Sequence, residues 1–153
     1  MKLATLCYVR RNRHTLMMLR NKKANDIHEG KWNGLGGKFE PGETPEDCAR
    51  REVREECGLH AESLSMRGFI TFPLFKDAED WYVFVFTIDQ FSGELGDCAE
   101  GDLRWIPDDD LLSLNLWPGD RIFIPWLAQP RFFSGRFCYE NKQLTHHDVT
   151  FHD

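Results

Sequence analysis

Carboxylates gather in one short stretch of the chain, "GKFEPGETPEDCARREVREECGL", residues 37–59, where seven of 23 residues are Asp or Glu. If residues 45–57 form a helix, then Glu52, Glu55 and Glu56 lie within about 100° of one another around its axis. Like charges at this spacing repel, and carboxylates turned inward without partners are costly. Divalent cations such as Mg²⁺ or Mn²⁺, which prefer oxygen ligands, would relieve the repulsion. The alternative is a solvated surface helix held by Glu–Arg pairs.

The helix that would position these carboxylates has clear start and stop signals. Thr44 is a favourable N-cap, Pro45 suits the first helical position, and Asp47 stands three residues after the cap, as in a capping box. Gly58 is a natural end, since glycine adopts the left-handed conformation that closes a helix. The sequence therefore predicts one well-defined helix between Thr44 and Gly58.

A glycine-rich segment, "GLGGK" at residues 34–38, lies just upstream of this helix. Glycines let a backbone approach phosphate or metal closely, although such a segment alone is often only a turn. Together the loop and the helix form a longer pattern: Gly37, five residues, Glu43, seven residues, Arg51-Glu52-Val53, one residue, Glu55-Glu56, one residue, Gly58-Leu59. This pattern resembles the Nudix box in every defined position.

The resemblance implies both a fold and a chemistry. Nudix enzymes hydrolyse diphosphate linkages in compounds that join a nucleoside diphosphate to another group. The implied fold is of the α/β (α+β) class, an α/β/α sandwich with a mixed β-sheet and a catalytic loop–helix–loop. The implied cofactor is Mg²⁺, with Mn²⁺ as a possible substitute.

The same resemblance assigns roles inside the box. Glu52 and Glu56 would be metal ligands, with the carbonyl group of Gly36 or Gly37 nearby. Glu55 would bind a second metal ion or orient water. The general base is left open among these carboxylates.

Three residues of the box are expected to be structural. Glu43 and Arg51 would pair with each other and brace the loop against the helix. Gly58 would end the helix.

Segments outside the box extend the resemblance to MutT-type oxidised purine nucleoside triphosphatases, over roughly residues 3–140. They are "KWNGLGGKFEPGE", "CAEGDLRW" and "LWPGDRIFIPWL". By this resemblance Glu100 would be a further metal ligand or catalytic carboxylate, and Trp117 would stack on the purine. Asn33 and Asp120 would hydrogen-bond the base. Each of these residues has a plainer alternative. Glu100 could be an ordinary acid in a loop and Trp117 a core residue. Asn33 could belong to a turn, and Asp120 could simply stand at the start of a helix.

One feature departs from the animal members of this group, which carry two adjacent acids after Trp-Pro. Here the pair is Gly119-Asp120, so one carboxylate is left for the base, which weakens the case for strict 8-oxoguanine selectivity.

Lys38 would either contact phosphate or lie on the surface. Pro73 fits a bulge in a strand better than a marker of ADP-ribose cleavage. Three further residues lack a ligand-like companion set and are expected to bind no metal: His146, His147 and His152.

Composition excludes several other classes of protein. A length of 153 residues, 41% hydrophobic and 29% charged, predicts one globular domain spanning residues 1–153. A net charge of −6 disfavours a nucleic-acid polymer as partner. The five cysteines form no C-x-x-C motif, which indicates reduced thiols. With no signal peptide and no long apolar run expected, we predict a cytoplasmic monomer or homodimer without a membrane partner.

The remaining elements are expected to alternate between strands and helices within one unit. Strands are predicted over residues 3–9, 14–20, 65–75, 80–91 and 102–107, helical segments over 108–116 and 119–129, and a closing hairpin around "ENKQ" at 140–143.

The sequence thus predicts a Mg²⁺-dependent enzyme that cleaves (oxidised) purine nucleoside triphosphates such as 8-oxo-dGTP to monophosphate and diphosphate, and so sanitises the nucleotide pool. One alternative is a Nudix hydrolase of ADP-ribose, dinucleoside polyphosphates or capped RNA 5′ ends. A nucleotide-sensing Nudix domain without turnover is another, although such domains usually lose box carboxylates.

Overall fold

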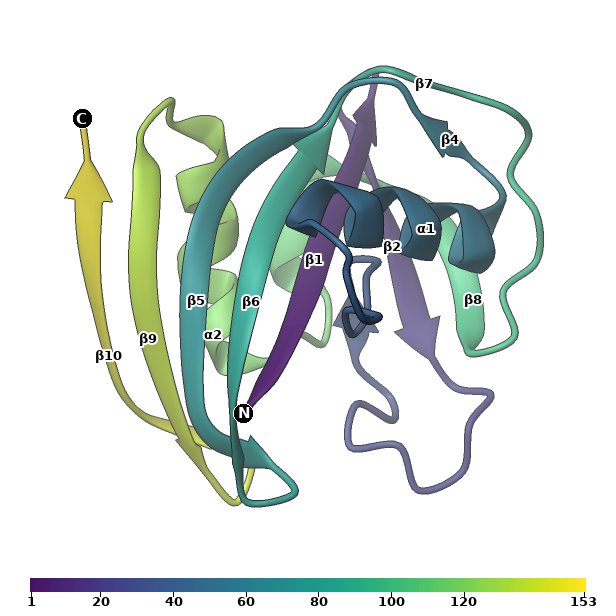
Figure 1. Cartoon of the computed structure of the whole chain (residues 1–153). Coiled ribbons are helices and arrows are strands. Elements are labelled where there is room, and N and C mark those ends of the chain that lie inside the picture. Colours follow the sequence, from purple (N-terminus) through teal and green to yellow (C-terminus); the bar gives the residue numbers. More distant parts are fainter.

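The computed structural model describes residues 1–153, as a central sheet with helices on both faces (Figure 1). The strands are β1 (Lys2–Arg11), β2 (His14–Arg20), β3 (Trp32–Asn33), β4 (His60–Ala61), β5 (Ser65–Lys76), β6 (Glu79–Ile88), β7 (Phe91–Ser92), β8 (Gly101–Pro107), β9 (Phe132–Glu140) and β10 (Gln143–His152). The helices are α1 (Pro45–Cys57) and α2 (Pro118–Phe123), with 3₁₀ segments η1 (Asp108–Ser113) and η2 (Ile124–Ala128).

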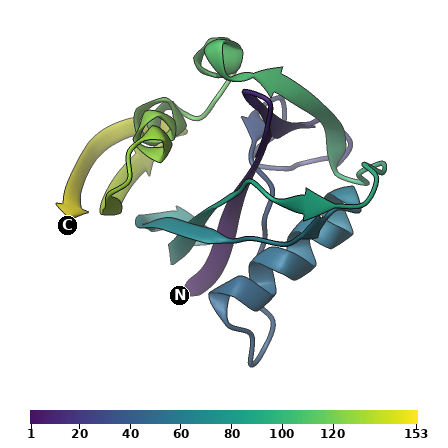
Figure 2. The same ribbon diagram turned by 90° about the horizontal axis from the view of Figure 1, so that it is seen from above.

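The large sheet is mixed, with the strand order β10-β9-β5-β6-β1-β2-β3 and with β8 paired to β2. Strands β1 and β6 run parallel, as do β5 and β9, while the other pairs are antiparallel. Helix α1 lies against one face, and α2 lies on the other, as the view from above shows (Figure 2). The predicted α/β/α sandwich with a mixed sheet is therefore confirmed.

Helix α1 begins and ends at the predicted residues. The Thr44 side chain accepts a hydrogen bond from the Asp47 amide at 3.0 Å, and the Asp47 carboxylate accepts one from the Thr44 amide at 3.1 Å. Gly58 closes the helix in the left-handed conformation, with φ of 80°. These caps satisfy backbone groups that the first and last turns would otherwise leave unpaired.

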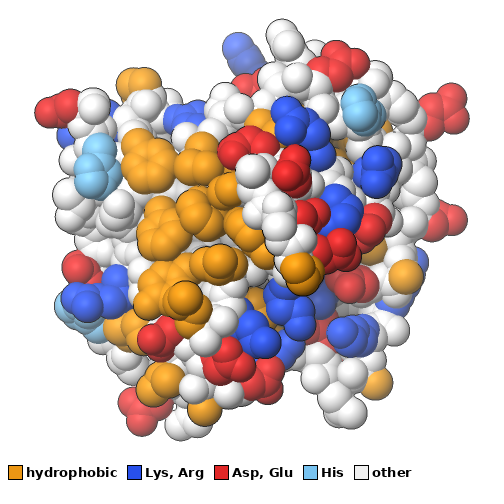
Figure 3. All heavy atoms as spheres, viewed as in Figure 1, with side chains coloured by type: hydrophobic (Ala, Val, Ile, Leu, Met, Phe, Trp, Pro, Cys, Tyr) orange, Lys and Arg blue, Asp and Glu red, His pale blue; other side chains and the backbone are white.

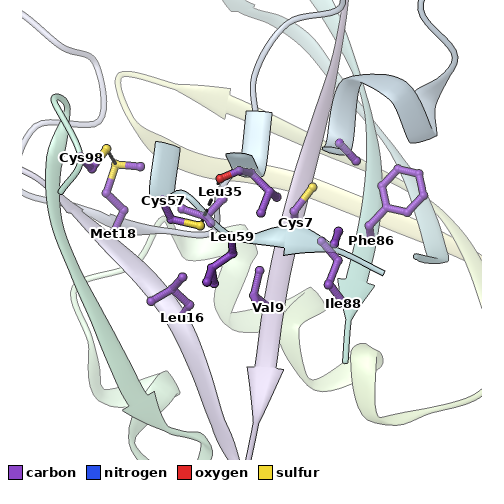
Figure 4. Packing of buried hydrophobic residues seen from close by; sticks show 13 residues of the cluster. Cys7, Val9, Leu16, Met18, Leu35, Cys57, Leu59, Phe86, Ile88 and Cys98 are labelled. Carbon is purple, nitrogen blue, oxygen red and sulfur yellow. Dashed lines mark hydrogen bonds between the residues drawn. The ribbon is translucent and has the colours of Figure 1, made fainter. Parts of the chain in front are cut away.

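Two hydrophobic clusters hold helices to the two faces of the sheet. Beneath α1, Cys7 and Val9 of β1 pack with Phe86 and Ile88 of β6 (Figure 4), and Val53 of α1 joins this cluster. The second cluster, on the other face, consists of side chains from several strands, from η1, α2 and η2, and from the segment before α2: Tyr8, Met17, Ile70, Val85, Ile106, Leu111, Leu116, Phe123, Ile124, Leu127, Phe133 and Phe137. The sheet is thus buried on both sides, as the mixed topology requires.

Three element predictions need correction. The helical segment expected over residues 119–129 is α2 followed by η2, because Pro125 lacks the amide that would continue the α-helical pattern. The segment over residues 108–116 is a 3₁₀ helix that ends at Ser113. The strand expected over residues 80–91 ends at Ile88, and Phe91 pairs with β4 instead.

Two smaller features match the sequence patterns. The closing hairpin turns at Asn141 and Lys142, both at positive φ (52° and 64°), as two-residue hairpin turns require. Pro73 lies where the pairing of β5 with β6 is irregular, between Phe72 and Lys76. None of the helices combines the length and the apolar character needed to cross a membrane.

Candidate active site

A cavity of about 510 Å³ opens beside the glycine-rich loop. Its wall comes from β1, β2, β3, the loop, α1, β5, β6, β9 and the start of α2. Nine of the predicted site residues line it: Asn33, Gly36, Gly37, Lys38, Arg51, Glu52, Glu100, Trp117 and Asp120. Glu55, Glu56, Glu43 and Gly58 lie outside its lining.

Two glycines bring the loop close to its neighbours. A Cβ atom on Gly36, at φ of 136°, would lie 2.1 Å from the Thr5 carbonyl oxygen of β1. A Cβ atom on Gly37 would lie 2.5 Å from the Cδ atom of Glu52. Only glycine therefore lets the backbone press between β1 and α1 and reach the carboxylate face of the helix.

Glu56 is the most deeply buried of the helix carboxylates, at 8% exposure. Its Oε1 atom accepts a hydrogen bond from the Gly36 amide at 2.6 Å, which joins the helix to the loop. Burial raises its pKa to about 8, and the negative charges of Glu52 and Glu100 act in the same direction, although the Gly36 amide opposes them. The charge of Arg20 also lowers this pKa, but no Lys or Arg side chain forms a salt bridge with the Glu56 carboxyl group.

Glu52 and Glu55 differ in their surroundings. The Glu52 side chain is 17% exposed and accepts a hydrogen bond from Arg51 Nη1 at 2.7 Å. Burial raises the pKa of Glu52, while Arg51 lowers it. The Glu55 side chain is 55% exposed and lies 3.3 Å from the same guanidinium nitrogen. The mixed charges over α1 are visible on the surface, next to an apolar area (Figure 3).

Arg51 joins the loop to the helix, as the box pattern predicts. Its Nε and Nη2 atoms donate to the two carboxylate oxygens of Glu43, both at 2.8 Å. The guanidinium lowers the pKa of Glu43 to about 2, and the Glu40 amide acts in the same direction. Arg51 also donates to the Lys38 carbonyl oxygen at 3.0 Å. The bidentate pair of Arg51 and Glu43 fixes the loop relative to α1.

The carboxylates nearest the cavity are already engaged within the protein. Glu52 is bound by Arg51, Glu56 by the Gly36 amide, and Glu100 lies 3.7 Å from Arg20 Nη2. In this arrangement no group of three or more His, Cys, Asp or Glu side chains could hold a metal ion. The Gly37 carbonyl oxygen likewise accepts from the Thr5 amide at 2.9 Å.

The chemistry of these donors nevertheless fits a divalent cation of the Mg²⁺ type. Carboxylate oxygens are the ligands that such ions prefer. Burial raises the pKa values of Glu52 and Glu56, so a nearby cation would offset a cost that the fold now bears. Glu52, Glu56 and Glu100 are therefore the residues that would hold it.

Two polar side chains at the opposite end of the cavity lack protein partners. The Nδ2 atom of Asn33 is buried without a hydrogen bond. Asp120 is 6% exposed, and burial raises its pKa to about 7, with Lys31 opposing the shift. No protein group donates a hydrogen bond to its carboxyl group. Because buried polar groups are costly when unpaired, this end of the cavity is suited to a polar ligand.

Trp117 lies at this end but is held among other rings. Its Nε1 atom donates to His28 Nδ1 at 2.8 Å, and the rings of His28, Phe75 and Tyr139 meet it edge-on at centroid distances of 5.5, 5.2 and 5.3 Å. The side chain is only 3% exposed. Little of the indole surface faces the cavity, so stacking on a base stays a prediction.

Sequence reasoning missed several residues of the wall. His28, Phe72, Phe75 and Tyr139 all line the cavity, from a polar loop, β5 and β9. The aromatic residues in β5 predicted only a strand, and nothing in the hairpin sequence indicated a site. Burial lowers the pKa of His28 to about 4, with Arg20 acting in the same direction. The ring is therefore neutral, and its Nδ1 atom can accept the hydrogen bond that Trp117 donates.

The comparisons with known proteins agree with this geometry. Residues 1–127 match the family described as "NUDIX domain". The oxidized purine nucleoside triphosphate hydrolase of Mus musculus is 34% identical over 125 residues, covering 82% of this chain and 80% of that protein. The enzyme of the same name from Danio rerio is 34% identical over 132 residues, covering 86% and 81%. The crystal structure of a MutT protein from Bacillus halodurans superimposes with a TM-score of 0.86 at 26% identity, covering 97% of both chains.

The chain therefore belongs to the Nudix family, and it is a pyrophosphohydrolase of that family. Within the family its relatives and its fold place it with the MutT-type enzymes. The Nudix prediction from the box pattern and the MutT-type prediction from the segments outside the box are thus both confirmed.

Proposed function

We propose that this enzyme hydrolyses purine nucleoside triphosphates, with 8-oxo-dGTP as the preferred substrate, to the monophosphate and diphosphate. The cavity itself carries the proposal, because it joins carboxylates at one end to unpaired, buried polar groups at the other. A nucleotide has the matching polarity, with an anionic phosphate chain and a polar aromatic base. The names of the relatives from mouse and zebrafish support the oxidised purine as the base.

At the phosphate end, the residues would bind and orient the reacting groups. Water attacks phosphorus, the bond to the bridging oxygen breaks, and monophosphate and diphosphate leave. A bound Mg²⁺ or Mn²⁺ would neutralise charge on the phosphates and lower the pKa of water. Glu52, Glu56 and Glu100 would hold the metal, Lys38 would contact phosphate, and one carboxylate among these or Glu55 would accept the proton from water.

At the base end, Asn33 and Asp120 would hydrogen-bond the purine. The amide of Asn33 offers both a donor and an acceptor, and its Nδ2 donor is the one left unpaired. The carboxylate of Asp120, in its ionised form, would accept a hydrogen bond from an N–H group of the base. Trp117 would complete the wall, with Phe72 and Phe75 as further aromatic surfaces.

This activity would clear oxidised nucleotides from the pool before a polymerase can use them, and we place it in the cytoplasm. A capped-RNA substrate is disfavoured. An enzyme that binds RNA usually has a basic strip on its surface for the phosphates, whereas the net charge of this chain is −6. A sensing domain without turnover is disfavoured because every box carboxylate is present.

The deciding experiment compares kcat/KM for 8-oxo-dGTP, dGTP, dATP and ADP-ribose with Mg²⁺, and identifies the products by chromatography. We expect the oxidised nucleotide to be preferred by at least about tenfold over each other substrate, the factor that one good hydrogen bond supplies. A smaller preference would overturn the substrate assignment and leave the family assignment intact. Efficient cleavage of ADP-ribose would favour the alternative Nudix substrates.

A further inference from the structure

The start of α2 has room for a hydroxyl group that comes from another strand. Gly119 carries no side chain, and a Cβ atom there would lie 2.6 Å from the Tyr139 hydroxyl oxygen and 2.8 Å from Cδ1 of Phe137. The position beside Asp120 is therefore filled by a phenol from β9. No side chain on residue 119 itself could occupy this space without displacing the phenol.

The hydroxyl oxygen of Tyr139 has one protein partner. The Gly119 amide donates to it at 2.7 Å, so this oxygen acts as an acceptor toward the backbone. No protein acceptor receives the hydroxyl proton, and Tyr139 lines the same cavity as Asp120 and Asn33. Burial and the charge of Asp120 raise the pKa of Tyr139, so the phenol keeps its proton at physiological pH.

The tyrosine ring is itself fixed. It meets Trp117 and Phe75 edge-on, at centroid distances of 5.3 and 5.6 Å, and lies 6.4 Å from Phe72 with the two ring planes inclined by 29°. Aromatic packing of this kind restricts the ring to one orientation. A group held this rigidly is suited to selecting a ligand, since little side-chain entropy is lost on binding.

Building on the proposed function, we propose that the Tyr139 hydroxyl determines base specificity by donating a hydrogen bond to an acceptor atom on the purine. The acceptor would lie next to the N–H group that Asp120 binds. Guanine-type bases present such a pair, since the O6 acceptor is adjacent to the N1–H donor. The donor from β9 and the acceptor from α2 would thus read two neighbouring atoms of one base edge.

A purely structural role makes a different prediction. If the hydroxyl only accepts from the Gly119 amide, its removal leaves that amide unpaired and loosens the start of α2. The melting temperature would then fall, and all nucleotides would be affected alike. A role in base recognition instead changes the discrimination among bases.

The test uses Tyr139→Phe, which keeps the ring, with Tyr82→Phe as the matched control outside the cavity lining. Measurements are kcat and KM for 8-oxo-dGTP, dGTP and dATP with Mg²⁺, the affinity for 8-oxo-dGMP by calorimetry without metal, and the melting temperature. For Tyr139→Phe we expect kcat/KM for 8-oxo-dGTP to fall about five- to tenfold, mainly through KM, with a similar loss of 8-oxo-dGMP affinity. The dATP value should change less than twofold, because adenine carries an amino donor at position 6 in place of the carbonyl acceptor, and Tyr82→Phe should match the wild type.

Equal losses for all three triphosphates, or a lower melting temperature with unchanged selectivity, would overturn this proposal while the proposed function stands. If the wild type hydrolyses none of the triphosphates, the proposed function fails, and the 8-oxo-dGMP affinities decide the present inference alone. Weaker binding by Tyr139→Phe would then support it. Unchanged binding, or no binding by the wild type, would overturn it.

Discussion

At the scale of single residues, Glu56 combines burial with a link to the glycine-rich loop. We expect Glu56→Gln to lower kcat/KM with 8-oxo-dGTP by at least about 100-fold, because an amide cannot replace a charged metal ligand worth several kcal/mol. The side-chain volume is unchanged, and the amide oxygen can still accept from Gly36. Steady-state kinetics over a range of Mg²⁺ concentrations checks this.

The matched control for this variant is Glu46→Gln, in the first turn of the same helix and outside the cavity lining. It should retain wild-type kcat/KM. If Glu56→Gln hydrolysed 8-oxo-dGTP as fast as the wild type, Glu56 would not be a metal ligand or a catalytic group.

Asp120 should make stability depend on pH. Its pKa is about 7 in the folded protein against 3.8 for an unperturbed Asp, so the folded state binds more protons between these values. The free energy of unfolding should therefore fall as pH rises through about 7. Asp120→Asn cannot titrate at this position, so the variant should lose less stability than the wild type between pH 5.5 and pH 8.0. We expect the two losses in the free energy of unfolding to differ by at least about 1.4 kcal/mol, the equivalent of one pKa unit.

Urea unfolding of both proteins at the two pH values measures this difference. Glu56 titrates in the same direction in both proteins, so its effect cancels in the comparison. The exposed Asp109→Asn should show the wild-type pH dependence. Parallel pH profiles for Asp120→Asn and the wild type would show that the Asp120 carboxyl group has no raised pKa.

At the scale of elements, helix α1 is a platform whose ends are fixed by local hydrogen bonds. We expect Thr44→Ala to lower the free energy of unfolding by about 1 kcal/mol, because the Asp47 amide loses its acceptor. Thr44→Ser keeps the hydroxyl group and should cost less than about half as much. Chemical denaturation of the three proteins gives the comparison, and equal losses for both variants would mean that the cap does not stabilise the helix.

The contrast between predicted and missed elements follows from where their information lies. The caps of α1 and the turn of the last hairpin are encoded by neighbouring residues, so the sequence predicts them. The two-residue strands β4 and β7 exist only because they pair with each other across a distance in sequence, as His60 pairs with Ser92. Such pairing leaves no pattern in the local sequence. The division of the predicted helix into α2 and η2 is likewise not encoded locally, apart from the signal that Pro125 gives.

At the scale of the whole molecule, the same distinction divides the candidate site. Most of the carboxylate end is built by one loop and one helix that are adjacent in sequence, and the box pattern describes them, whereas Glu100 comes from the segment just before β8. The base end is assembled from segments that are distant in sequence: His28 and Trp117, which share a hydrogen bond, are 89 residues apart, and Tyr139 comes from β9. The resemblance to MutT-type enzymes supplied Trp117 there, but His28 and Tyr139 became visible only when the chain was folded.

The last hairpin, β9 with β10, lies beyond the family match, which ends at residue 127, yet it belongs to the core. Phe133 and Phe137 of β9 are fully buried between the sheet and α2. Removing a buried Phe side chain typically costs about 3–5 kcal/mol, and a domain of this kind is stable by about 5–15 kcal/mol. A chain ending at Gln129 would lose both side chains together with the strand that pairs with β5.

We therefore expect the chain 1–129 to lose cooperative unfolding, as measured by circular dichroism during urea titration. The control, a chain ending at Phe151, lacks only an exposed His and Asp and should unfold like the full chain. If the chain 1–129 unfolded at the same urea concentration and with the same slope as the full chain, the hairpin would be an appendage. The base end of the cavity, which depends on Tyr139, would then rest on a strand that the fold does not require.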